Sequence, residues 1–244
     1  MRVWRYIDFP KLVWALTQDA LVLTRVDTLD DKREGRHGKY LYEAAVQFEM
    51  RQLEAEGVPA DHGERHRRAN LFGEMIWRNE ELTRAISFVS CWCKGGESEA
   101  MWRIYGGRGA SVALALPYER LRDSLDGDRL YVGTVTYFDF NRGVLPPDNV
   151  FRPIMFKGHE YIYEDEVRIA TFDPTLWEDD GAGGGRRPRP DRPNVVTVPS
   201  AIRDHVEKIV ISPYAARWQA DAIRAVVGRL SPGLESRIFD SEMT

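Results

Sequence analysis

Short runs of apolar residues, many of them β-branched or aromatic, recur along the chain and predict a framework of β-strands. The expected strands are residues 3–7, 20–24, 86–93, 110–116, 130–138, 161–171, 195–198, 206–211 and 236–239. Polar loops and glycines separate these runs, and the sequence contains no internal repeat. The pattern indicates a β scaffold into which other elements are inserted.

Apolar positions at helical spacing predict the helices around this scaffold. One is expected at residues 9–16, where Asp8 is suited to be the N-cap, another around 98–105, and another from about 215 to 230. From about 39 to 85 the chain is helical in character and charged, with a break at Gly57, Val58 and Pro59. The expected fold class is α+β, with a central, mostly antiparallel β core.

The domain organisation follows from the same pattern. No shift in composition is sharp enough to mark a domain boundary, so residues 1–244 are expected to form a single domain. Within it we expect a helical insertion at about 39–85. A flexible loop rich in glycine, proline and arginine is expected at about 178–193.

Composition narrows the class of protein. The 244 residues are 43% hydrophobic and 30% charged, which is typical of a globular chain, and the net charge of −4 excludes binding of nucleic acid by bulk positive charge. There is no apolar run of about 18 residues and no apolar signal segment, so a cytoplasmic protein with no membrane partner is expected. Cys91 and Cys93 are too few and too close for a disulfide framework.

Glu164 and Glu166 are the first candidates for chemistry. On a strand, alternate side chains share a face, so both glutamates are expected on the same face as Arg168, with Val167 and Ile169 directed to the core. Fixed carboxylates stabilise positive charge that develops in a transition state. The alternative is a solvated outer face on which Arg168 screens the two glutamates, and spacing alone favours that alternative.

Other polar and aromatic positions are less specific. Ser90 lies near a strand end, where a hydroxyl can bind a ligand. Trp102 and Tyr105 are three residues apart on one face of a helix, a pairing that belongs to a core more often than to a cofactor site. No metal is expected, because the histidines and the two cysteines do not have the spacing of zinc ligands.

The order of these motifs resembles the bacterial family known as domain of unknown function 2971. The motifs are Trp4-Arg5-Tyr6, Asp31 with Glu34, Ser90-Cys91, Met101-Trp102 with Tyr105 and Gly109, and finally Lys157, Tyr161, Tyr163, Glu164, Glu166 and Arg168. Asp30 and Tyr161 stand where that family more often has asparagine and tryptophan. The resemblance covers the chain apart from the helical region and the glycine-rich loop.

A basic residue on the first strand, a serine on a middle strand and Glu-x-Glu on a late strand are also similar in order to ADP-ribosyltransferases. This resemblance implies a split sheet, NAD as the cofactor that is consumed, and a role for each matching residue. Arg5, or Arg25 in its place, would bind a phosphate or ribose of NAD, Ser90 would position the nicotinamide ribose, and Tyr105 or Trp102 would stack on nicotinamide. Glu166 would grip the ribose 2′-hydroxyl and Glu164 would orient the acceptor. Tyr6, Lys157 and Arg168 complete the expected cofactor-binding set.

The resemblance leaves the acceptor open among nucleic acid, protein and small molecule, and it implies a bacterial toxin or phage-defence effector. The only hint of a polyanionic acceptor in the sequence is the arginine tract at residues 186–189. The helical region at about 39–85 is expected to cover the cleft, form a homodimer or bind an inhibitor protein.

Two other functions stay open. One is a non-catalytic module that binds a nucleotide or a partner in the same cleft. The other is a magnesium-dependent nuclease or hydrolase, because grouped carboxylates with a lysine can hold Mg²⁺ and assist phosphodiester cleavage. Its residues would be Asp31, Glu34, Glu164, Glu166 and Lys157.

Overall fold

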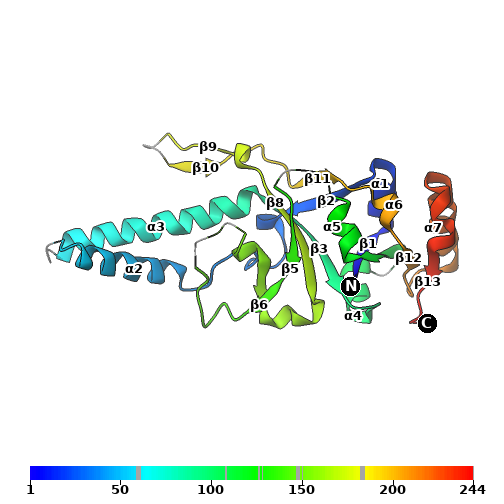
Figure 1. Cartoon of the computed structure of the whole chain (residues 1–244), viewed down its shortest axis with the longest axis horizontal. Coiled ribbons are helices and arrows are strands. Elements are labelled where there is room, and N and C mark those ends of the chain that lie inside the picture. Colours follow the sequence, from blue (N-terminus) through cyan, green and yellow to red (C-terminus); the bar gives the residue numbers. More distant parts are fainter. Residues whose placement is uncertain are drawn as a thin grey trace.

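The computed structural model describes residues 1–58, 62–107, 109–125, 127, 129–146, 149, 151–181 and 185–243. Its centre is a nine-stranded sheet with the strand order β11-β2-β3-β1-β4-β12-β13, from which β8 and β5 branch at β3 (Figure 1). The strands are β1 (Arg2–Asp8), β2 (Ala20–Arg25), β3 (Ser87–Lys94), β4 (Ser111–Pro117), β5 (Tyr131–Thr134), β8 (Glu166–Phe172), β11 (Val195–Pro199), β12 (Lys208–Ile211) and β13 (Ile238–Asp240). Among these described pairs only β12 and β13 run parallel. The expected α+β class with a mostly antiparallel central sheet is confirmed.

The sheet divides at β3. On one edge of β3, β8 pairs along the strand from Ser87 to Cys93. On the other edge two strands share it: β2 pairs with Phe88 and Val89, and β1 pairs with Cys93 and Lys94. Between them, Ser90 to Trp92 have no strand partner on that edge among the described residues. The backbones of β1 and β2 therefore separate above the middle of β3.

Helices and a large apolar core cover the sheet. α1 (Phe9–Gln18) begins at Asp8, whose side chain accepts a hydrogen bond from the Lys11 backbone N–H, so the expected N-cap is present. α1 and α7 (Arg217–Leu230) pack against each other on one side of the sheet (Figure 1). Val167 and Ile169 lie in this core, as their alternation along the strand predicts. The shorter helices are α4 (Glu99–Met101), α5 (Tyr118–Asp123) and α6 (Ile202–His205).

Two antiparallel helices project from the sheet and give the molecule its elongated shape (Figure 1). They are α2 (Leu41–Ala55) and α3 (His62–Ile86), and they occupy the region expected to be a helical insertion. Val58 precedes α3, and Pro59 lies outside the described residues. At the base of the pair, Glu80 of α3 accepts hydrogen bonds from Arg36 and from the His37 backbone N–H. No helix of the described residues is long and apolar enough to cross a membrane.

Three expected segments differ from the structure. Residues 130–138 are not one strand: β5 ends at Thr134, and β6 (Thr136–Phe138) pairs with β7 (Phe156–Gly158) in a separate sheet. The strand expected from residue 161 begins only at Glu166, because the 3-10 helix η4 (His159–Glu164) precedes it. The loop expected at 178–193 is in part a ribbon, in which β9 (Trp177–Asp179) pairs with β10 (Arg186–Pro188). Residues 182–184 of that loop lie outside the described residues.

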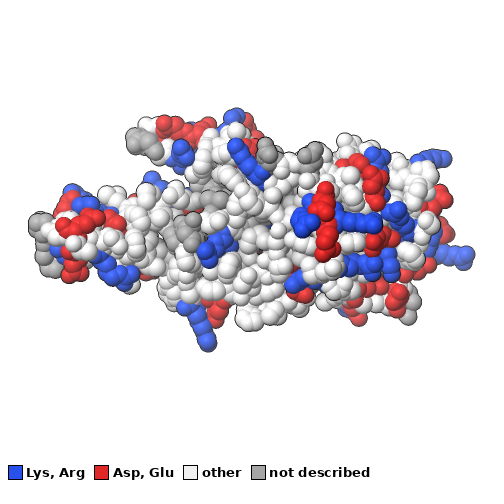
Figure 2. Space-filling view, in the orientation of Figure 1, with Lys and Arg blue, Asp and Glu red and all other residues white. Residues whose placement is uncertain are grey.

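Figure 2 shows that basic and acidic side chains intermingle at both ends of the face it displays, and that the middle of this face carries few charges. The arginines of the tract at residues 186–189 likewise have partners within the chain. Arg187 pairs with Glu178, Arg189 pairs with Asp191, and Arg186 lies over the ring of Trp177. The expectation of a polyanionic acceptor at this arginine tract gains no support from these contacts.

Candidate functional site

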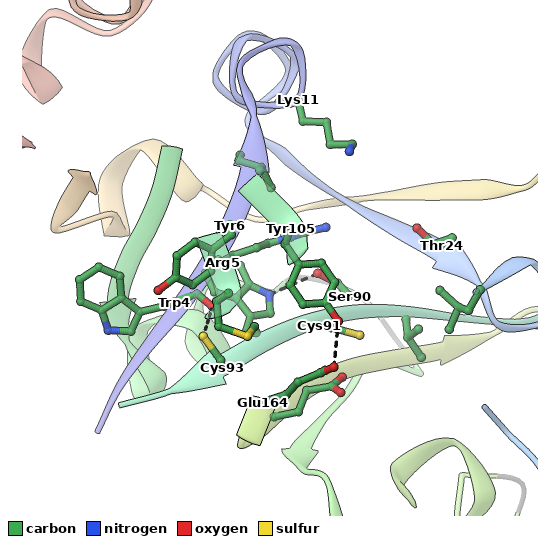
Figure 3. Close-up of a pocket in the computed structure, with 16 residues that line it drawn as sticks. Trp4, Arg5, Tyr6, Lys11, Thr24, Ser90, Cys91, Cys93, Tyr105 and Glu164 are labelled. Carbon is green, nitrogen blue, oxygen red and sulfur yellow. Dashed lines mark hydrogen bonds between the residues drawn. The ribbon is translucent and has the colours of Figure 1, made fainter. Parts of the chain in front are cut away.

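A cavity of about 230 Å³ opens where β1 and β2 separate above β3 (Figure 3). Its lining brings together most of the residues that the sequence singled out: Arg5, Tyr6, Ser90, Tyr105, Glu164 and Glu166. These side chains come from β1, β3, the helical turn after α4, the end of the 3-10 helix η4 and the start of β8. Trp102, Lys157 and Arg168 belong to the expected set but do not line the cavity.

Arg5 lies on the cavity wall and spans the gap in the sheet. Its guanidinium donates to the backbone carbonyl of Val22 on β2 (3.0 Å) and lies 5.7 Å from the ring centre of Trp92. Among the described residues no carboxylate forms an ion pair with Arg5. Burial accordingly lowers the pKa of Arg5 to about 10, an effect that the nearby Cys91 thiol offsets only in part. Arg5 is therefore a half-buried cation that lacks an anionic partner among the described residues.

Arg25 forms hydrogen bonds that connect segments of the chain and does not face the cavity. Its guanidinium donates to Asp27 (2.6 Å) and to the carbonyl oxygens of Arg192 and Pro193 (3.1 and 2.7 Å). These bonds fix the end of the glycine-rich segment against β2, and Arg25 does not line the cavity. Of the two arginines that the sequence left open as phosphate ligands, only Arg5 faces the cavity.

Ser90 and Tyr6 line the cavity with hydroxyls that are already hydrogen-bonded. The Ser90 hydroxyl accepts from the indole N–H of Trp92 (3.2 Å), which leaves its own proton for a second partner. The Tyr6 hydroxyl accepts from the backbone N–H of Ser98 (2.8 Å), and its ring packs edge-on against Trp102. Tyr6 thus holds the segment after β3 in place, in addition to forming part of the wall.

Trp102 and Tyr105 do not share a helix face, contrary to the sequence expectation. Residues Trp102–Gly106 form a π-helical turn, η2, which is wider than an α-helical turn and rotates residues three apart to different sides. Trp102 is fully buried and donates to Glu97 (2.7 Å). Tyr105 is 44% exposed at the cavity rim and donates to Glu164 (3.1 Å), as Figure 3 shows. Tyr105 is thus the aromatic residue of this pair that a ligand would meet.

Glu164 and Glu166 reach the cavity from different backbone elements. Glu164 ends η4, Asp165 follows in the left-handed conformation (φ 39°), and β8 begins at Glu166, so the expectation of one shared strand face is wrong. The solvated alternative is wrong as well, because Glu164 is 3% and Glu166 1% exposed. The turn at Asp165 nevertheless brings both carboxylates to the same ammonium group, that of Lys157.

Lys157 and Arg168 hold these carboxylates from behind the cavity wall. The Lys157 ammonium donates to Glu164 (2.6 Å) and to Glu166 (3.3 Å). Arg168 is fully buried and binds Glu166 through two nitrogens, at 2.7 and 2.9 Å. The role implied for both residues, contact with the cofactor, therefore has no support in the geometry: their partners are the glutamates.

The pKa values of the two glutamates are shifted in opposite directions. Burial raises the pKa of Glu166, but Arg168 and Lys157 outweigh that effect and hold it at about 2. Burial also raises the pKa of Glu164, and there the Lys157 ammonium offsets the rise only in part. Glu166 is consequently a permanent carboxylate at neutral pH, whereas Glu164 takes up a proton more readily. Two neighbouring acids with opposite shifts are the arrangement expected of groups with different roles in one reaction.

Glu34 joins this group from the polar loop before the helical pair, and the sequence named it in a family motif and as part of a hypothetical metal site. It binds Arg168 (2.9 Å) and lies 3.3 Å from Lys157. Asp31, the fifth member of that hypothetical metal site, instead accepts from the Arg33 backbone N–H. The three glutamates thus converge on the Lys157 ammonium, and a divalent cation would have to displace it.

Sequence reasoning missed several residues of the site. Lys11 and Thr24 line the cavity, as does Cys91, which the sequence named only within a motif and without a role. The Tyr137 hydroxyl accepts from the Glu166 backbone N–H (2.9 Å). The sequence could have indicated Lys11 as a site residue, because it lies in the first turn of α1 directly after β1. Cys91 follows Ser90 on β3, and burial raises the pKa of its thiol, so it lines the wall in the neutral form.

Comparison of the chain with protein-family models, with curated proteins and with solved structures found no match. The resemblances noted in the sequence therefore stay predictions, and the argument for function depends on the cavity.

Proposed function

We propose that the protein is an ADP-ribosyltransferase-like enzyme that cleaves NAD in this cavity and transfers ADP-ribose to an acceptor. The observation that carries the proposal is the charge pattern of the cavity wall, where Arg5 lacks an anionic partner and Glu164 and Glu166 present carboxylates. NAD has the matching pattern, with an anionic diphosphate and a cationic nicotinamide ring. Arginine suits the diphosphate, because its fork of donors matches phosphate oxygens.

The chemistry requires a fixed negative charge beside the sugar. When the bond between C1′ of the ribose and the nicotinamide nitrogen breaks, its electron pair leaves with nicotinamide and positive charge develops on the ribose. Glu166, ionised and held by Arg168 and Lys157, stabilises that charge without reorganising. The acceptor then forms the new bond to C1′, and its proton passes to Glu164, whose raised pKa suits a general base.

The size and the shape of the cavity support binding of part of the dinucleotide. A volume of about 230 Å³ is below the roughly 300–1,000 Å³ of pockets that enclose a whole ligand. The nicotinamide riboside end would enter, with the exposed Tyr105 ring available for stacking, and the rest would extend outward past Arg5. The division of the sheet at β3 supports the split sheet that the resemblance implies.

The test is release of nicotinamide from NAD by the purified protein, alone and with cell extract, for wild type and for Glu166→Gln. The amide cannot stabilise the developing charge, so the variant should lose at least about 100-fold in turnover. Circular dichroism checks its fold, because Glu166→Gln leaves Arg168 and Lys157 with one carboxylate fewer. Glu164→Gln, which removes a carboxylate with less ionic support, provides a second variant.

Glu160→Gln is the matched control, since Glu160 lies near the site in η4 but pairs with Arg33 at the surface. Wild-type turnover in Glu166→Gln would refute the proposal. Cleavage of nucleic acid that a chelator abolishes, without release of nicotinamide, would favour the metal-dependent hydrolase. A rise in melting temperature with NAD, without turnover of any kind, would favour the binding module.

A further inference from the structure

Glu34 is buried at the centre of the charge cluster, although it precedes Glu164 by 130 residues and Glu166 by 132 residues in the sequence. Its carboxylate binds Arg168 through both oxygens, at 2.9 and 3.2 Å, and lies 3.3 Å from the Lys157 ammonium. Only 4% of Glu34 is exposed. The two cations that hold Glu164 and Glu166 are therefore shared with a third carboxylate.

The loop that carries Glu34 is fixed to α3. Arg84 donates to the backbone carbonyl of Glu34 (2.8 Å) and to that of Lys32 (3.3 Å). Gly35 follows with φ +73°, and a Cβ there would lie 2.8 Å from a methyl group of Val26 and 3.0 Å from Cγ of Arg84. A residue with a side chain does not fit at this position without a shift of the loop. These contacts hold the backbone of the loop at Glu34, and the ion pairs with Arg168 and Lys157 hold its carboxylate.

We infer that Glu34 is a positioning residue for the two glutamates of the cavity and acts on them through Lys157 and Arg168. With Glu34 present, three carboxylates share two cations, and one carboxylate is left with incomplete compensation. That one is Glu164, which lacks the two-nitrogen contact that Arg168 makes with Glu166. Glu34 thereby divides the two glutamates into one fixed anion and one proton acceptor.

The groups that face the Glu164 carboxylate come from several elements. Lys157 of β7 and Tyr105 of η2 bond to it, and Glu166 of β8 raises its pKa by repulsion. Cys93 of β3 and Tyr137 of β6 are close enough for Glu164 to raise their pKa. Removing the charge of Glu34 leaves Lys157 free to compensate Glu164 more fully. The pKa of Glu164 should then fall.

The experiment is an NMR titration of isotope-labelled glutamate carboxyls in wild type and in Glu34→Gln, with the Glu164 signal assigned by Glu164→Gln. We expect Glu164 to titrate about one pH unit lower in Glu34→Gln, the usual order of effect when one charge of a shared cluster is removed. Glu34→Asp, which keeps the charge but withdraws it by one methylene, should give a smaller shift in the same direction. Asp31→Asn is the matched control, because Asp31 lies in the same loop outside the cluster. Its Glu164 should titrate as in wild type.

An unchanged titration of Glu164 in both Glu34 variants would overturn the inference, even if both variants melt at a lower temperature, because a merely structural residue would change only stability. The consequence for turnover rests on the proposed function: the acid limb of the pH profile for nicotinamide release should move to lower pH in Glu34→Gln. Absence of turnover in wild type would refute the proposed function, and the titration would still decide the role of Glu34.

Discussion

The buried and half-buried arginines of this protein differ in their binding partners. Arg25 binds Asp27, Arg84 binds Glu81, and Arg168 binds Glu34 and Glu166. Among the described residues, Arg5 donates to a backbone carbonyl and lies over an aromatic ring, and no carboxylate pairs with it. A partly desolvated charge without a counter-charge is costly for folding, and the proposed anionic ligand would supply that counter-charge.

This contrast predicts that Arg5→Gln separates ligand binding from stability. The amide keeps a hydrogen-bond donor for Val22 but has no charge for a phosphate. The KM for NAD should rise at least about tenfold, the usual range for a lost charge-assisted contact, while the melting temperature stays the same or increases. Nicotinamide release and thermal unfolding measure the two effects.

Arg2→Gln is the control for Arg5→Gln, because Arg2 lies on the same strand and pairs with Glu207 away from the cavity. It should leave the KM for NAD unchanged. A drop in the melting temperature of Arg5→Gln with no change in KM would show that Arg5 holds β1 to β2 and does not bind the ligand.

At the scale of elements, the sequence predicts the strands that hold the site better than it predicts the turns. β1, β2, β3 and β4 lie within a residue or two of their expected ranges, because apolar β-branched runs are a strong local signal. Two turns at the site escape such reasoning. Nothing in the spacing of Met101 to Gly106 distinguishes a π-helical turn from an α-helical one, and the turn at Asp165 interrupts a stretch that alternates like a strand.

The charge cluster is also only partly predictable from the sequence. Glu-x-Glu is visible in the sequence, but whether those glutamates are solvated depends on Lys157 and Glu34, which reach them only after the chain folds. The spacing of Trp102 and Tyr105 could not show that Trp102 lies in the core and Tyr105 at the cavity rim, because that difference follows from the π-helical turn. Motif order named residues that line the cavity and also named Glu34, Lys157 and Arg168, but only the tertiary contacts show which of these residues face the cavity and which support them.

The π-helical turn makes a prediction of its own at Gly106. A Cβ there would lie 2.8 Å from the ring of Trp102 and 3.1 Å from the Ser111 hydroxyl oxygen, and both residues are buried. Gly106→Ala should destabilise the protein by about 1–3 kcal/mol, the usual cost of overpacking, and displace Tyr105 from Glu164. Urea unfolding and the KM for NAD measure the two consequences.

Gly96→Ala provides the comparison, since Gly96 has no neighbouring atom within 4 Å of an added Cβ and lies in the turn after β3. It should leave the free energy of unfolding within about 0.5 kcal/mol of wild type. If Gly106→Ala proves equally neutral, the turn around Trp102 adjusts, and its geometry does not fix the position of Tyr105.

At the scale of the whole molecule, the charge cluster connects the sheet to the projecting helices. Glu34, held by Arg84 of α3, meets Arg168 of β8, which meets Glu166 at the cavity. Each member depends on the others, because a buried charge that loses its partner is destabilising by several kcal/mol. The cluster therefore ties the stability of the fold to pH.

Glu166 sets the sign of this dependence at acid pH. Its pKa falls from the usual 4.5 to about 2 in the folded protein. A carboxyl with a lowered pKa contributes stability above its unfolded pKa, and that contribution is lost as the pH falls from 4.5 to about 2. The loss corresponds to about 3 kcal/mol for a group this deeply buried. The raised pKa of Glu164 acts in the opposite direction and reduces the net loss, because the folded state there binds its proton more tightly.

The free energy of unfolding in urea, measured between about pH 2 and pH 7, should therefore decline steeply below about pH 4.5 in wild type. In Glu166→Gln the same curve should start lower at neutral pH, because Arg168 and Lys157 lose a carboxylate, and should decline less between about pH 4.5 and pH 2. Glu160→Gln, an exposed glutamate paired only with Arg33, should reproduce the wild-type slope. Parallel curves for wild type and Glu166→Gln would mean that acid unfolding originates elsewhere. The pH dependence of the free energy of unfolding would then give no evidence that Glu166 is ionised in the folded protein. The proposed chemistry depends on that ionised state.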